Sequence, residues 1–162
     1  MTSPVDIRRA RPGDEPALAA LFREMQAHYE SSDPPGGADA SAAYAVGAGA
    51  RQPFTLVAEQ GGRLVGFANL TPVFYGTAYQ WLLFLKDLFV GEAGRASGAG
   101  TALLRAMASL ARDEGYCRID WTTDPGNTGA QRLYDRLGVP RQEKVFYRLA
   151  GADLLRLAAD DE

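Results

Sequence analysis

A loop of small residues is the part of the sequence best suited to hold a ligand. Arg95-Ala96-Ser97-Gly98-Ala99-Gly100 follows an apolar segment and precedes a run of residues with helical spacing. Small side chains let the backbone amides approach a ligand closely, and the start of a helix adds a partial positive charge. Arg95 places a full positive charge beside them. This combination favours an anion such as a pyrophosphate.

Two other interpretations of the loop stand beside this one. Gly98-x-Gly100 matches the start of a dinucleotide fingerprint, with Asp120 about 20 residues further on, but the third glycine is replaced by Leu103. A tight turn without a ligand also accounts for a lone Gly-x-Gly. A Walker loop is excluded, because no Gly-Lys-Ser/Thr follows.

Length and composition limit the classes of function. The chain has 162 residues and a net charge of −3, which predicts one domain over residues 1–162 and argues against nucleic acid as a partner. The apolar run Trp81 to Val90 is too short to span a bilayer, so no membrane association is expected. The single cysteine predicts a reducing, cytoplasmic setting, and no Cys/His spacing indicates a metal site.

Hydrophobic periodicity predicts strands and helices that alternate along the chain. A long central strand is expected at Trp81 to Val90, directly before the small-residue loop, while 71–79 is expected to be a loop. The other expected strands are 7–10, 54–59, 64–70, 118–123 and 143–149, and the expected helices are 14–28, 39–50, 98–114, 128–137 and 152–159. This order predicts an α/β domain with a mixed sheet and helices on its faces.

Two motifs in this order resemble those of the GNAT N-acetyltransferases. Arg95-x-x-Gly98-x-Gly100, preceded by Asp87-Leu88-Phe89-Val90, is similar to the family's Arg/Gln-x-x-Gly-x-Gly/Ala motif. Asn127-x-x-Ala130-x-x-x-Tyr134-x-x-x-Gly138 is similar to its later segment, and the likeness is greatest to the spermidine/spermine (diamine) branch. The resemblance implies the GNAT fold: a mixed, mostly antiparallel sheet with a central splayed parallel strand pair, flanked by helices.

The resemblance also implies acetyl-CoA as co-substrate, a small-molecule amine as acceptor, and a homodimer. The parallel strands at 81–90 and 118–123 would separate to admit the pantetheine arm, which would pair with the backbone of Leu88, Phe89 and Val90. The residues implied to bind the rest of CoA are Arg95, Ala96, Ser97, Gly98, Ala99, Gly100, Thr101, Asn127 and Ala130.

Tyr134 is implied to be the general acid that protonates the departing thiolate, because a phenol with a pKa of about 10 keeps its proton at neutral pH. Two structural interpretations remain open. Tyr134 lies on one helical face with Leu133 and Leu137, which is also typical of a core residue. Asn127 follows Pro125-Gly126, which is typical of a helix N-cap.

The acceptor side departs from the diamine branch, where a glutamate commonly precedes the Asp-Leu/Phe-Phe-Val segment. Here that position is Lys86, which would repel a polyamine and attract a carboxylate, so a zwitterionic amine is expected. A solvated lysine is the alternative interpretation. The expected substrate-binding residues are Lys86, Asp87, His28 and Tyr75, with Trp81 and Tyr79 as possible pocket residues.

The general base is not specified by the sequence. The candidates are Asp87, Glu59, His28 and Glu30, and a histidine on an amphipathic helix is more often a surface residue. The segment 31–37 is interpreted as a lid over the acceptor or as a plain linker. Cys117 is expected to be a small buried residue and not a nucleophile.

Three rival functions remain at this point. The first is an acyl-CoA-binding module without catalytic activity, and the second is a nicotinamide dinucleotide binder that uses Gly98-x-Gly100. The third is acetylation of a protein N-terminus or lysine.

Overall fold

The computed structural model describes residues 3–28, 36–47, 52–75 and 80–159. Its internal contacts divide the chain into a first unit, Met1–Asp124, and a second unit, Pro125–Glu162. The two units are described separately below.

The first unit is built on a five-stranded sheet in the order β1-β2-β3-β4-β5. The strands are β1 (Val5–Arg9), β2 (Phe54–Gln60), β3 (Arg63–Tyr75), β4 (Gln80–Val90) and β5 (Ile119–Asp120). The first four strands pair antiparallel, and β4 pairs parallel with β5. The expected mixed, mostly antiparallel sheet with one parallel pair is therefore confirmed, although β5 is the last strand of this sheet and not a central one.

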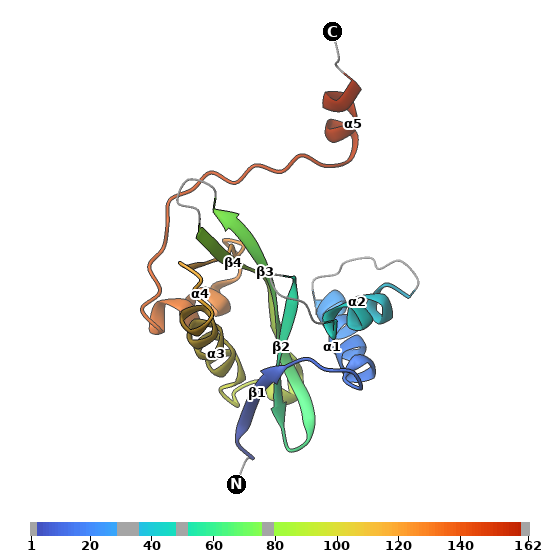
Figure 1. Ribbon diagram of the computed structural model, residues 1–162, viewed down its shortest axis with the longest axis vertical. Coiled ribbons are helices and arrows are strands. Elements are labelled where there is room, and N and C mark those ends of the chain that lie inside the picture. Colours follow the sequence, from blue (N-terminus) through green and yellow to red (C-terminus); the bar gives the residue numbers. More distant parts are fainter. Residues whose placement is uncertain (1–2, 29–35, 48–51, 76–79, 160–162) are drawn as a thin grey trace. The chain divides into compact units, whose positions relative to one another are not determined.

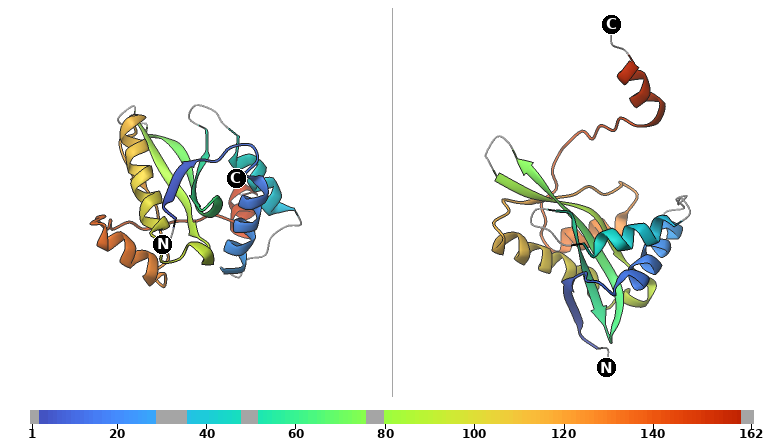
Figure 2. Two further views of the ribbon diagram at one scale, coloured as in Figure 1. Left: turned by 90° about the horizontal axis from the view of Figure 1, so that it is seen from below. Right: turned by 45° about the vertical axis from the view of Figure 1, so that its right-hand side comes forward.

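Helices α1 (Glu15–His28) and α2 (Gly37–Ala45) cover one face of the sheet (Figures 1 and 2). The apolar residues of α1 recur at helical spacing, so one face of the helix packs on the strands. Phe22 of α1 meets Phe67 of β3 edge to face, with the ring centroids 4.7 Å apart, and Phe67 in turn contacts Phe89 of β4. These aromatic contacts anchor α1 beside the middle of the sheet.

Helix α3 (Ala99–Asp113) covers the opposite face, and the short 3-10 turn η2 (Glu92–Gly94) connects β4 to it (Figure 1). Leu103 and Met107 of α3 are fully buried. Gly94 packs so tightly on β3 that a Cβ at this position would lie 2.7 Å from the Cβ of Val65. Only glycine therefore allows the loop after β4 to lie this close to the sheet.

The second unit contains α4 (Thr128–Arg136) and α5 (Gly151–Ala159), joined by an extended segment (Figure 1). Gly138 follows α4 with a φ of 72°, the left-handed conformation expected of a helix C-cap glycine. Neither helix has a buried residue among those described.

Several predicted elements were wrong in type or extent. Residues 71–75 continue β3 because they pair with 80–84 of β4, whereas a loop was expected over 71–79. The strand expected at 118–123 is reduced to Ile119–Asp120, and the helix expected at 39–50 is observed at Gly37–Ala45. Residues 143–149 alternate like a strand but form none, because no described strand pairs with them.

No helix of the described residues is long and apolar enough to cross a membrane.

Candidate functional site

The parallel strands β4 and β5 stay together over only two residue pairs, Leu83 with Ile119 and Phe84 with Asp120. The amide of Leu83 donates to the carbonyl of Arg118 at 3.0 Å, and further pairing on this side of β4 ends at Phe84 within the described chain. Beyond this point β4 continues to Val90, bonded to β3 along its other edge. The edge of β4 that includes Leu88, Phe89 and Val90 is therefore open to an extended ligand.

The small-residue loop presents several backbone amides at the N-terminus of α3. The amides of Arg95, Ser97 and Ala99 donate within the loop, to the carbonyls of Glu92 and Gly94 and to the hydroxyl of Ser97. The described structure provides no acceptor for the amides of Ala96, Gly98, Gly100 and Thr101.

Backbone conformation explains how this arrangement arises. Ala96 and Gly98 both adopt left-handed backbone, with φ of 62° and 84°, which turns successive amides toward the same side. Gly98 is the N-cap residue of α3 and supplies no side-chain cap, so the next two amides of the first turn, Gly100 and Thr101, keep their donors for a ligand. Amides grouped at a helix N-terminus form an anion site, which fits the pyrophosphate of CoA.

A bulge in β4 places two adjacent charged residues in one cavity. Asn69 pairs with Asp87 and Leu70 with Leu85, so Lys86 is the extra residue between them. In a regular strand, neighbouring side chains point to opposite faces, but a bulge changes this alternation. Lys86 and Asp87 consequently line the same cavity of about 500 Å³. Its other lining residues come from α1, α2, β2, β3 and the approach to β2, among them Phe22, Met25, Ser41, Thr55 and Asn69.

The carboxylate of Asp87 is oriented by two polar side chains on neighbouring strands. The hydroxyl of Thr55 donates to Asn69 Oδ1 at 2.7 Å, and Asn69 Nδ2 donates to Asp87 Oδ2 at 3.0 Å. Thr55 is almost completely buried, which fixes the start of this chain of bonds. Neither Thr55 nor Asn69 was predicted from the sequence to belong to the site. Their positions opposite each other on two adjacent antiparallel strands were the available signal.

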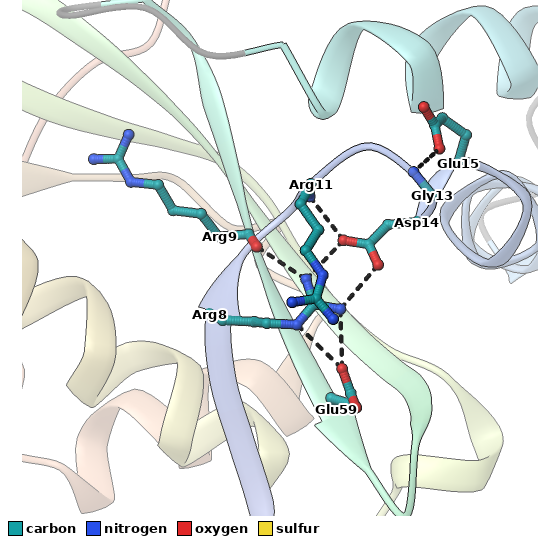
Figure 3. Close-up of polar contacts among 7 residues, drawn as sticks. All are labelled: Arg8, Arg9, Arg11, Gly13, Asp14, Glu15 and Glu59. Atoms are coloured by element: carbon teal, nitrogen blue, oxygen red, sulfur yellow. Dashed lines mark hydrogen bonds and ion pairs between the residues drawn. The ribbon is translucent and has the colours of Figure 1, made fainter.

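Glu59, a candidate base, is already engaged in an ion-pair cluster (Figure 3). Arg8 donates to Glu59 Oε2 at 2.9 Å and to both oxygens of Asp14 at 2.7 and 2.8 Å. The Arg8 hydrogen bonds lower the pKa of Asp14 below its usual value, with a smaller contribution from the amide of Arg11. The cluster ties β1 and β2 to the start of α1 and lines a separate cavity of about 550 Å³. Neither Lys86 nor Asp87 lines that cavity.

Two of the remaining acceptor-side candidates, His28 and Trp81, do not line the cavity that contains Lys86. His28 is the last residue of α1 and is exposed, with its ring 6.3 Å from that of Phe89 and outside the lining of the cavity. Tyr75 is the last residue of β3, and Trp81 is half-buried on β4. Glu30, Tyr79 and all but the end of the 31–37 segment lie outside the described residues.

In the second unit, the capping role expected of Asn127 is confirmed. Its Oδ1 accepts the amide of Ala130 at 3.2 Å at the start of α4. Tyr134 is half-buried on the same helix. The prediction for Cys117 was wrong: it is exposed, and its amide donates to the carbonyl of Trp81 just before β5. A two-residue strand at a sheet edge does not cover the residue that precedes it.

Three comparisons with known proteins bear on this site. The Acetyltransferase (GNAT) family model matches residues 18–139. An uncharacterized N-acetyltransferase of Bacillus subtilis, YhfO, is 31% identical over 134 residues, covering 83% of this chain and 89% of its own. The D-amino-acid N-acetyltransferase HPA3 of Saccharomyces cerevisiae is 27% identical over 146 residues, covering 90% of each chain.

A solved structure shares the fold. Aminoglycoside N-acetyltransferase AAC(6')-Iy, determined in complex with CoA, has a TM-score of 0.74 at 23% identity and covers 90% of this chain and 95% of its own. The mixed sheet, its short parallel pair and the loop at the N-terminus of α3 define the class of acyl-CoA-dependent acyltransferases. The chain belongs to the GNAT acetyltransferase family.

Proposed function

We propose that this enzyme transfers an acetyl group from acetyl-CoA to the primary amine of a small zwitterionic molecule. The observation that carries the proposal is the separation of β4 from β5 after Phe84 and Asp120, beside a helix N-terminus with uncommitted amides. An extended pantetheine arm fits the open edge of β4, and a pyrophosphate fits the amides of Ala96, Gly98, Gly100 and Thr101.

The donor and acceptor regions meet on one short segment of β4. The backbone edge of residues 85–90 faces the separation from β5, while the side chains of Lys86 and Asp87 line the cavity of about 500 Å³. An amine held in this cavity would lie beside a thioester held along the strand, and this proximity supplies a large part of the catalysis. A backbone amide aimed at the developing oxyanion typically contributes about 100- to 1000-fold in rate.

The charges of the cavity indicate the class of acceptor. Lys86 is suited to a substrate carboxylate, and Asp87, oriented by Asn69, is suited to an ammonium group. An amino acid carries both groups, and the yeast relative is named for D-amino acids. The resemblance to the spermidine/spermine branch suggests polyamines instead, but a lysine in the cavity disfavours a polycation.

Proton transfer is assigned to two residues. Asp87 is the proposed acceptor of the proton that the ammonium group loses before its nitrogen attacks the thioester carbonyl. Tyr134 is the proposed donor to the sulfur when the carbon–sulfur bond breaks. The nitrogen then releases its second proton to solvent, and the products are free CoA thiol and the N-acetylated amine. The support for Tyr134 is its place in the segment that begins at Asn127, which resembles the family motif.

Two further features are proposed for the whole protein. One free, exposed cysteine fits a reducing, cytoplasmic environment. A homodimer is expected from the family resemblance.

The test is release of free CoA thiol with a panel of amines: L- and D-amino acids, a polyamine, an aminoglycoside and a lysine-containing peptide. Turnover with amino acids at a higher kcat/KM than with the polyamine is the expected result. Turnover with the peptide alone would contradict a small-molecule acceptor. CoA binding without thiol release from any amine would indicate a binding module, and thermal stabilisation by NAD but not by CoA would overturn the choice of donor.

A further inference from the structure

We propose that the acceptor is an amino acid with an apolar side chain, which packs against the apolar walls of the cavity that contains Lys86 and Asp87. This inference rests on the proposed function, because it names which zwitterionic amines that site accepts. The residues that carry it all belong to the first unit.

The charges of this cavity come from one strand. Among the described residues that line it, only Lys86 and Asp87 carry a formal charge, and both lie at the bulge of β4. Opposite charges on adjacent residues match the ammonium and carboxylate groups of an α-amino acid, which are attached to a single carbon. An amino acid bound in this way places its charged groups beside β4, so its side chain extends toward the other walls.

The other walls of the cavity are mainly apolar and come from two helices and two strands. Their apolar residues include Phe22 and Met25 of α1, Ala40 and Ala45 of α2, Phe54 of β2 and Leu70 of β3. The two phenylalanines and the leucine are buried, and the methionine is half-buried, so this surface is fixed by its packing in the core.

The polar residues of the lining add no further charge. Thr55 and Asn69 are engaged in the chain of hydrogen bonds described above. The other polar lining residues are Gln26, Ser41 and Thr71, which are uncharged. A charged substrate side chain would therefore lose hydration without gaining an opposite charge from the described lining, whereas an apolar side chain gains free energy by leaving water.

The size of the cavity agrees with this class of acceptor. Its volume of about 500 Å³ lies within the range of small-ligand sites, which are lined mainly by apolar side chains and a few well-placed polar groups. The charged pair on β4 thus recognises what all amino acids share, and the apolar walls distinguish between them.

Three amino acids of similar shape test the inference directly. Leucine, asparagine and aspartate have branched side chains that differ in polarity and charge, and each is supplied in its L and D forms with acetyl-CoA. Thiol release is expected to give a kcat/KM at least about tenfold higher for leucine than for asparagine, with aspartate lowest.

The outcomes separate this inference from the proposed function. Equal kcat/KM values for the three, or the highest value for aspartate, would overturn the inference and leave amino acids as the acceptors. Acetylation of no amino acid at all would overturn the proposed acceptor class, and the inference with it.

A charge placed in the apolar wall should reverse the preference. Met25→Glu is expected to raise the kcat/KM of arginine relative to leucine at least about tenfold, and arginine is used because its guanidinium is not a second acceptor amine. Ala27→Glu adds the same charge at an exposed position of α1 outside the described lining and should leave the ratio unchanged. No change in Met25→Glu, or an equal change in both variants, would contradict the inference.

A steric substitution on α2 tests the same wall without a charge. Ala40→Trp narrows the cavity and is expected to lower the kcat/KM of phenylalanine relative to alanine at least about tenfold. Ala43→Trp, at an exposed position of the same helix outside the described lining, is the matched control, and thermal unfolding checks that both variants fold. An equal loss for both amino acids in Ala40→Trp would mean that the side chain does not extend toward α2.

Discussion

Helices α3 and α5 have similar amphipathic sequences and opposite environments. Leu103 of α3 is fully buried against the sheet, whereas Leu155 of α5 is 68% exposed. Periodicity predicted both helices within one or two residues of their bounds, because it depends only on the helix itself. Burial depends on a second surface, and the first unit supplies one for α3. An apolar helical face therefore requires a second surface to be buried, and the sequence of the helix does not identify that surface.

The largest loss of unfolding free energy is expected at Leu103, which packs on the sheet of its own unit. Leu103→Ala leaves a cavity under α3 and should lower the free energy of unfolding by about 2–5 kcal/mol at any protein concentration. Leu155→Ala, at an exposed position of α5, should cost less than about 0.5 kcal/mol. Urea unfolding of the two variants measures both losses. A loss for Leu155→Ala as large as that for Leu103→Ala would contradict the difference between the two helices.

The next largest loss of unfolding free energy is expected from the ion-pair cluster of the first unit. Arg8→Met leaves the carboxylates of Asp14 and Glu59 without their shared cation, and the expected loss of unfolding free energy is about 2–4 kcal/mol. Arg23→Met, which removes the exposed pair with Asp39, should change it by less than about 0.5 kcal/mol. Equal losses would mean that burial does not distinguish the two pairs.

The same cluster makes the free energy of unfolding depend on pH. The folded-state pKa of Asp14 is lowered, so its contribution is fully present above the usual carboxyl range and is lost as pH falls through the folded pKa. The stability difference between the wild type and Asp14→Asn should therefore shrink as pH falls below about 4. Urea midpoints between pH 2 and 7 measure it, and a difference that grows toward acid would contradict the assignment.

Substitution of Tyr134 in the second unit should lower turnover more than it weakens CoA binding. Tyr134→Phe removes the proposed proton donor and is expected to lower kcat by about 10- to 100-fold, with little change in the Kd of CoA. Thiol release and calorimetry measure these two quantities. Unchanged kcat would remove Tyr134 from the mechanism, and loss of CoA binding would indicate a role in packing.

The smallest expected effect is a change in acceptor preference. Lys86→Glu reverses the charge in the acceptor cavity and should shift the ratio of kcat/KM for a diamine over an amino acid by about tenfold toward the diamine. Arg105→Glu on the exposed face of α3 is the matched control and should leave this ratio unchanged. An equal shift in both variants would mean that Lys86 acts at long range or not at all.

Local patterns in the sequence predicted the fold well where they determine structure by themselves. The long strand before the loop, the helix after Gly98 and the cap at Asn127 follow from apolar spacing, left-handed glycine and N-cap chemistry. The separation of β4 from β5 came from the family resemblance, and the geometry agrees with it.

Features that depend on pairing between distant segments could not be predicted from one segment alone. The bulge at Lys86 exists because β3 and β4 fall out of register, and only this register brings Lys86 and Asp87 into one cavity. The bond from Asn69 to Asp87 has the same origin. The strand predicted at 143–149 is not formed for the corresponding reason: apolar residues alternate in this segment, but no described strand pairs with it.

The central claim is that the loop amides around Gly98 bind the pyrophosphate of CoA, and calorimetric titration of CoA tests it most directly. Gly98 and Gly115 both adopt left-handed backbone and have open space where a side chain would be added, so substitution should strain both similarly. Gly98→Asp places a negative charge at the anion site and is expected to raise the Kd of CoA at least about tenfold, while Gly98→Asn has a smaller effect and Gly115→Asp has none. Wild-type affinity in Gly98→Asp, or an equal loss in Gly115→Asp, would contradict the account.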